Sequence, residues 1–177
     1  MEYLEIGGRC LICLVFLVAA VSKVAGHDAF DVFTSSVRDM QLVRSGGVRR
    51  VALLVVAAEF CVCALMVIPV TGSGIAGFAL AALLLTAFAV GIVRVSRRGV
   101  RAPCRCFGAS AVPLGARHVV RNLALVAVAV SGIAAALSTE GVRLSGETAV
   151  AALGGLLLGG LVVMLDDVYT LFQSVDG

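Results

Sequence analysis

The chain has 177 residues, of which 60% are hydrophobic and only 14% charged, and its mean hydropathy is +1.08. A soluble domain is about 45–50% apolar and about 25% charged, so this composition excludes an ordinary water-soluble globule and predicts an integral membrane protein. The net charge of +3 comes almost entirely from arginine, which in such a chain indicates topology rather than nucleic-acid binding.

Five apolar stretches predict five membrane-spanning helices, because each is close to the ~20 residues that cross a hydrocarbon core and backbone amides there must pair within the chain. The stretches cover residues 10–25, 51–70, 75–93, 119–137 and 148–165. The first follows Glu2, Glu5 and Arg9 and precedes Lys23, which is unlike a cleavable signal peptide. We therefore expect it to be a retained spanning helix.

The segment 27–47 is too polar to span a membrane. Phe30, Phe33, Val37 and Met40 recur in it at helical spacing. This pattern predicts an amphipathic helix in the membrane interface. The alternative is a segment folded back on the bundle.

Two glycine-containing segments indicate close helix contacts. The run 71–74 predicts a tight turn that makes the second and third spans antiparallel neighbours. In the fifth span, Gly155 and Gly159 form a small-xxx-small pair, which lets two helices approach closely. Their partner helix lies either in this chain or in a second copy.

The positive charges predict the orientation of the chain. Five crossings place two residues, Arg9 and Arg143, on one face of the membrane and twelve on the other. The twelve are Lys23, Arg38, Arg44, Arg49, Arg50, Arg94, Arg97, Arg98, Arg101, Arg105, Arg117 and Arg121. The positive-inside rule then predicts that the N-terminus lies outside and that the loop between the third and fourth spans is cytoplasmic. The membrane we expect for this multi-pass protein is the cytoplasmic (inner) membrane of a bacterium.

That loop contains Cys104 and Cys106, between Pro103 and Gly108. Neighbouring arginines favour the thiolate, which is the form that attacks disulfides. A disulfide between residues two apart closes a small, strained ring, and strained disulfides are the labile, catalytic kind. Unreactive loop cysteines are the alternative. A metal site would need further ligands at recognisable spacing, and none is predicted.

Two other cysteine pairs lie in apolar stretches. Cys10 and Cys13 fall on one helix face, whereas Cys61 and Cys63 point to nearly opposite sides of their helix and cannot bridge each other. Ordinary packing is the simpler interpretation of both pairs. The three pairs are expected near the inner surface, in mid-membrane and near the outer surface, and a thiol relay through them across the bilayer is a hypothesis.

The second chemical signal is charge within the membrane. Glu59 lies nine residues from Arg50, at a depth of ~13 Å, where a carboxylate needs a partner. Lys23 can snorkel and is the natural candidate. The pair would hold two helices together, or Glu59 would carry protons or contact a quinone head group. Arg121 and Asn122 open the fourth span, where they would cap the helix or anchor the cysteine loop.

These features, in this order, resemble the MauE branch of the DoxX-like membrane proteins. The motifs are Ser22-Lys23, the aromatic spacing from Phe30 to Arg38, Glu59, Pro69, Cys104-x-Cys106-Phe107-Gly108 and Arg121-Asn122-Leu123. They cover roughly residues 10–137. The resemblance implies an all-α fold with a four-helix transmembrane core, residues 1–140, followed by an extra C-terminal helix and tail, residues 141–177.

The resemblance also implies thiol–disulfide chemistry. MauE-type proteins are associated with maturation of the disulfide-rich small subunit of methylamine dehydrogenase, beside a thioredoxin-like partner. Cys104 and Cys106 would be the redox pair, with Glu59, Lys23, Arg121 and Asn122 as the polar framework around it.

The leading hypothesis is therefore a membrane thiol–disulfide oxidoreductase that exchanges electrons with a thioredoxin-like protein, with a quinone as a candidate second couple. The alternative is a non-catalytic assembly subunit of a larger membrane complex or a homodimer, with the glycine-rich fifth helix and the interfacial segment as its contacts. A small transporter is a weaker alternative, because only two charges lie within the membrane and broken helices are lacking.

Overall fold

The computed structural model describes residues 1–98, 116–138 and 146–173, and throughout these ranges the regular structure is helical. Five helices are long and apolar enough to cross a membrane: α1 (Glu2–Val24), α3 (Val48–Val67), α4 (Thr71–Arg97), α5 (Ala116–Leu137) and α6 (Gly146–Gln173). A shorter α2 (Ala29–Asp39) and a 3₁₀ turn, η1 (Ser45–Gly47), connect α1 to α3. The predicted all-helical membrane fold is confirmed.

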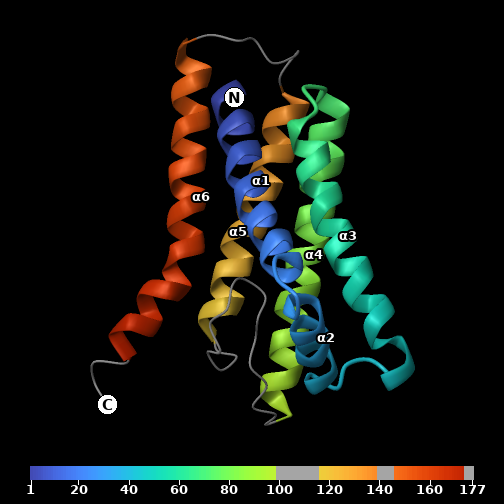
Figure 1. Ribbon diagram of the computed structural model, residues 1–177. Coiled ribbons are helices and arrows are strands. Elements are labelled where there is room, and N and C mark those ends of the chain that lie inside the picture. Colours follow the sequence, from blue (N-terminus) through green and yellow to red (C-terminus); the bar gives the residue numbers. More distant parts are fainter. Residues whose placement is uncertain (99–115, 139–145, 174–177) are drawn as a thin grey trace.

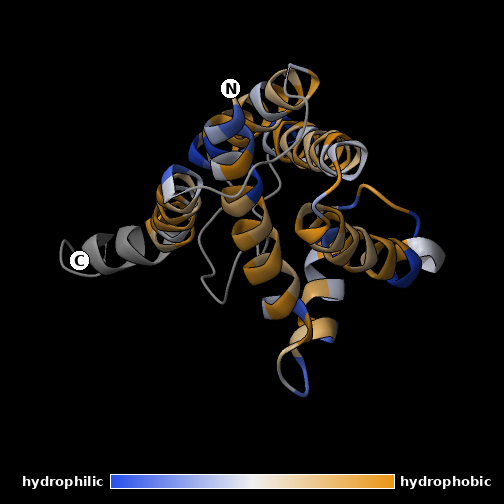
Figure 2. Cartoon of the chain, turned by 90° about the horizontal axis from the view of Figure 1, so that it is seen from above, coloured by the Kyte–Doolittle hydropathy of each residue, from blue (hydrophilic) through white to orange (hydrophobic). Residues whose placement is uncertain are grey.

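The long helices run alternately up and down, with α1 between α6 on one side and α3 and α5 on the other (Figure 1). Seen from above, hydrophobic residues cover the helices along their lengths, and hydrophilic ones gather mainly near the helix ends (Figure 2). Many large apolar side chains point outward, among them Leu54, Leu83, Leu157 and Leu161. Apolar surface of this extent is expected where lipid, not water, surrounds the bundle.

The core lies where α1, α3, α4 and α5 meet. Phe16 of α1 and Phe78 of α4 are its largest fully buried side chains. Gly132 of α5 makes room for Phe78, because a methyl group at Gly132 would overlap the aromatic ring. Small residues thus let α4 and α5 approach closely, as is usual for helices that pack in a membrane.

The small-xxx-small pair of α6 finds its partner within the chain. A methyl group at Gly155 would overlap the backbone of Gly7, and one at Gly159 would lie 3.2 Å from the carbonyl oxygen of Leu11. The two glycines therefore let α6 pack directly on α1. The partner helix of Gly155 and Gly159 is therefore α1 of the same chain, not a helix of a second copy.

The amphipathic segment forms α2, as predicted, and it folds back on the bundle. Phe33 is buried against Ala52 and Val56 of α3. Gly26, with a φ of +123°, lies in the turn between α1 and α2, in a conformation that favours glycine. This turn places α2 beside the end of α1 and the start of α3 (Figure 1).

The turn between α3 and α4 differs from the prediction. It consists of residues 68–70, whereas the predicted turn, residues 71–74, forms the first turn of α4. Pro69 explains the shift, because proline disfavours a helical conformation in the residue before it. Ser73 then donates to the carbonyl oxygens of Ile68 and Val70 at 2.8 and 2.7 Å. The predicted antiparallel packing of the two helices is confirmed.

Candidate functional site

The segment predicted to carry the redox chemistry, with Cys104 and Cys106, lies outside the described residues. It joins α4, which ends at Arg97, to α5, which begins at Ala116. These two helix ends lie at the same end of the bundle as α2 (Figure 1). The role of the two cysteines therefore remains a prediction from sequence.

The two charges predicted within the membrane meet as an ion pair. The Lys23 ammonium at the end of α1 lies 2.8 Å from Glu59 Oε1 of α3 and 3.0 Å from Oε2. The side chains are only 2% and 1% exposed. Lys23 also donates to the carbonyl oxygen of Ala19 at 2.9 Å. The expected pairing of Lys23 with Glu59 is confirmed.

The ion pair and the aromatic ring beside it involve three helices, α1, α2 and α3. The Lys23 ammonium lies 5.2 Å from the centre of the Phe33 ring of α2, within the range of a cation–π interaction. Phe33 thus covers the cation while Glu59 neutralises it. A buried charge requires such compensation, and the arrangement explains why the amphipathic stripe of α2 turns toward the bundle.

Arg121 and Asn122 lie on α5, in the second turn rather than at its start, because the helix begins at Ala116. The predicted capping role is therefore wrong. Asn122 is 1% exposed, and its amide nitrogen and oxygen have no hydrogen-bond partner within the described part of the chain. A buried amide without a partner is uncommon, and it leaves this side chain free to bind a group beyond that part of the chain.

A second buried ion pair was not predicted. Arg9 of α1 contacts Glu5 one turn earlier, with 2.9 Å between Nη2 and Oε1, and both side chains are buried. The same guanidinium donates to the carbonyl oxygens of Ile68 at 2.8 Å and Val70 at 2.9 Å. Arg9 thereby fastens α1 to the α3–α4 turn. The i, i+4 spacing of Glu5 and Arg9 is the sequence signal that could have revealed the pair.

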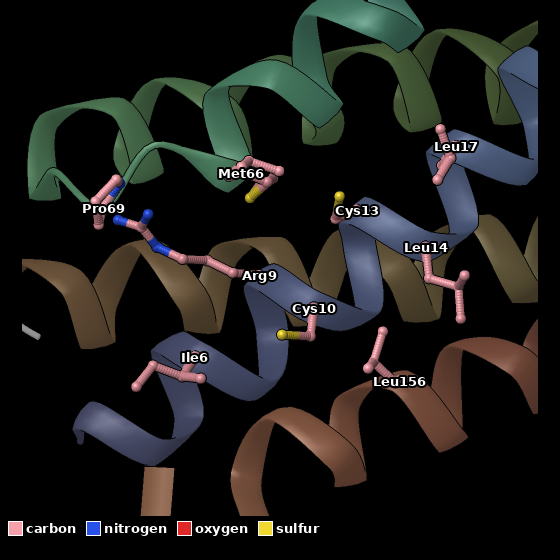
Figure 3. Close-up of a pocket in the computed structure, with 10 residues that line it drawn as sticks. Ile6, Arg9, Cys10, Cys13, Leu14, Leu17, Met66, Pro69 and Leu156 are labelled. Carbon is pink, nitrogen blue, oxygen red and sulfur yellow. The ribbon is translucent and has the colours of Figure 1, made fainter. Parts of the chain in front are cut away.

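Beside Arg9 lies a cavity of about 360 Å³ between α1, the end of α3 and α6 (Figure 3). Cys10 and Cys13 line it, in accord with the prediction that they share one helix face. The rest of the lining is mostly apolar and comprises Ile6, Arg9, Leu14, Leu17, Met66, Val67, Pro69 and Leu156. Leu17, Val67 and Leu156 are exposed, so the cavity opens on the outer surface of the bundle.

The other cysteine pair points two ways, as predicted: Cys61 is exposed and Cys63 is buried. The prediction missed that Cys63 meets Cys13 of α1, with 3.7 Å between the Cys63 sulfur and the Cys13 carbonyl oxygen. No cluster of three or more His, Cys, Asp or Glu side chains suited to a metal ion is present in the described ranges.

Five long apolar helices, an outward apolar surface and buried charge pairs define a multi-pass α-helical membrane protein with polar and thiol groups along the α1–α3 contact. A model of one protein family, described as methylamine utilisation protein MauE, matches residues 1–138. Because this match covers most of the chain, the protein belongs to the MauE family. No curated protein and no solved structure gives a significant match.

Proposed function

We propose that this MauE-family membrane protein is a thiol–disulfide redox protein in which Cys104 and Cys106 exchange electrons with a thioredoxin-like partner. The observation that carries the proposal is the Cys-x-Cys motif between Pro103 and Gly108, flanked by arginines, in a chain of this family. Neighbouring cations stabilise the attacking thiolate. The protein served would contain disulfides, as a methylamine-dehydrogenase-like subunit does.

In each exchange, one thiolate attacks the disulfide of the other protein and forms a mixed disulfide. The second thiol of the attacking protein then displaces the partner. One protein gains a disulfide and the other gains two thiols, so electrons and protons balance. Either protein can begin as the oxidised one, and a quinone is a candidate for restoring the starting state in the membrane.

The arrangement of charge supports a cytoplasmic position for this motif. At the end of the bundle where α2 lies, the described ranges contain four cations near helix ends: Lys23, Arg49, Arg97 and Arg117. Arg9 lies toward the opposite end of the bundle. By the positive-inside rule, the end rich in cations faces the cytoplasm of a bacterial inner membrane.

The Lys23–Glu59 pair and Asn122 support the proposal as a buried polar framework, with Lys23 near the end of α1 and Asn122 near the start of α5. Asn122 has an amide with no partner in the described ranges, and a polar group carried by another segment would satisfy it. The ion pair fixes the end of α1 against α3. These residues would position the reacting segment rather than react themselves.

The alternative function, an assembly subunit that contacts its complex through the glycines of α6, has lost its main support. Gly155 and Gly159 pack against α1 of the same chain. The second expected contact, the amphipathic segment, packs as α2 on α3 of the same chain through Phe33.

The proposal is tested by trapping the exchange. A Cys106→Ser variant should accumulate a mixed disulfide between Cys104 and its partner, because the thiol that resolves it is missing. Non-reducing electrophoresis of membranes, followed by mass spectrometry, would identify the partner. Cys61→Ser is the matched control and should trap nothing new. If neither Cys104→Ser nor Cys106→Ser traps a protein, thiol exchange at this motif is excluded.

A further inference from the structure

Cys13 of α1 and Cys63 of α3 meet across a helix contact, although they are 50 residues apart in the chain. The Cys63 thiol donates to the Cys13 carbonyl oxygen at 3.7 Å, which brings the two residues into direct contact between α1 and α3. Cys63 is 8% exposed, so water-soluble reagents have little access to it. The fold thus creates a dithiol that no local spacing in the sequence indicates.

Cys13 also lines the cavity beside α1, so one member of the dithiol is reachable from outside the bundle (Figure 3). Leu14, Leu17, Met66 and Leu156 make the walls apolar. The cavity opens where lipid surrounds the protein, and its size falls within the range of sites for small organic molecules. A ligand that enters from this side must therefore be lipid-soluble.

Glu59 places an ionisable group beside the second thiol. It lies one helical turn before Cys63 on the same face of α3, and both side chains are buried. Oxidation of two thiols releases two protons, which must move through a dry region. A carboxylate one turn away can hold such a proton in transit. Two cysteines that merely pack together would not require a carboxylate at this position.

We infer that Cys13 and Cys63 form a second dithiol–disulfide couple, oxidised by a lipid-soluble quinone that binds in the cavity beside Cys13. Two S–H bonds break and one S–S bond forms. The quinone takes up the two electrons and two protons and leaves as the hydroquinone. This inference does not rest on the reactivity of Cys104 and Cys106, and it can fail or succeed independently of the proposed function.

The test uses the full chain with Cys104→Ser and Cys106→Ser, in lipid nanodiscs, after reduction and removal of the reductant. Decylubiquinone is added, remaining thiols are blocked with N-ethylmaleimide, and mass spectrometry maps the disulfides after proteolysis. We expect a Cys13–Cys63 bond to form, and to form equally in a Cys61→Ser control. A bond between Cys10 and Cys13 instead, or no bond at all, would overturn the inference.

A matched pair of leucines on α6 tests the cavity. Leu156 lines it, whereas Leu157 is 75% exposed and lies outside the lining. Leu156→Trp should slow oxidation by the quinone about tenfold, equivalent to a loss of about 1.4 kcal/mol in binding, while Leu157→Trp should leave the rate unchanged. Equal rates in both variants would overturn the assignment of the cavity as the quinone site.

Discussion

Lys23 at the end of α1 and Glu59 within α3 form a buried ion pair, with 2.8 Å between Nζ and Oε1. Toward the opposite end of the same helix contact, Cys63 meets Cys13, and Arg9 then binds the α3–α4 turn. The contact between α1 and α3, with the turn that follows α3, therefore carries three polar links.

The ion pair should stabilise the fold only while both partners are present. Removing one partner of a buried pair costs about 3–5 kcal/mol, whereas replacing both with apolar residues is often nearly neutral. We expect Lys23→Met and Glu59→Leu each to destabilise the protein, and the double variant to recover most of the loss. Reversible unfolding in detergent measures this, with the exposed Arg50→Met as control. Additive losses in the double variant would contradict the account.

Arg9 leaves no room for a side chain at Gly74 of α4. A methyl group there would overlap the guanidinium, which four hydrogen bonds hold in place. Gly74→Ala should therefore destabilise the protein by about 1–3 kcal/mol, the usual cost of overpacking. Gly72 lies in the same turn, and a methyl group there would meet nothing within 4 Å, so Gly72→Ala should be neutral or stabilising by up to about 1 kcal/mol. Thermal unfolding of the two variants distinguishes these outcomes.

A similar pair of glycines tests the packing of α6 on α1. Gly155→Ala should push the helices apart at Gly7 and destabilise the protein by about 1–3 kcal/mol. Gly154→Ala, one residue earlier, points into open space and should have no such effect. The same unfolding assay checks both variants. If they behave alike, α6 does not pack through Gly155.

The orientation is testable with single cysteines in a cysteine-free chain. Gly46→Cys reports the end of the bundle that contains α2, and Gly72→Cys reports the opposite end, and both positions are exposed. An impermeant maleimide should label Gly72→Cys in intact cells and Gly46→Cys only after the membrane is opened. The reverse pattern would place the Cys104 segment outside the cytoplasm.

Much of the fold follows from the sequence because hydrophobicity and helix length are local properties. The sequence also predicts the Lys23–Glu59 pair, because a carboxylate at that depth needs a cation and only one lysine is present. The apolar stretch predicts a span that starts near Cys10, whereas α1 begins at Glu2. The reason is that Glu5 neutralises Arg9 one turn away, so the charges can be buried within the helix.

The remaining site features depend on how one helix sits against another. The meeting of Cys13 with Cys63 is set by the register of α1 against α3, and the contact of Gly155 with Gly7 by the packing of α6. Spacing along a single helix contains no information about either contact. Sequence patterns therefore suggested Cys10 with Cys13, whereas the structure brings Cys13 to Cys63.

The central claim, that Cys104 and Cys106 open and close a disulfide, is tested most directly by differential alkylation in native membranes. Membranes are equilibrated in glutathione buffers from reducing to oxidising, the free thiols are blocked, and mass spectrometry counts those protected. The account predicts that Cys104 and Cys106 become protected together at one potential, while the exposed Cys61 stays reactive. If both thiols react fully in every buffer, the protein does not perform thiol–disulfide exchange at this motif.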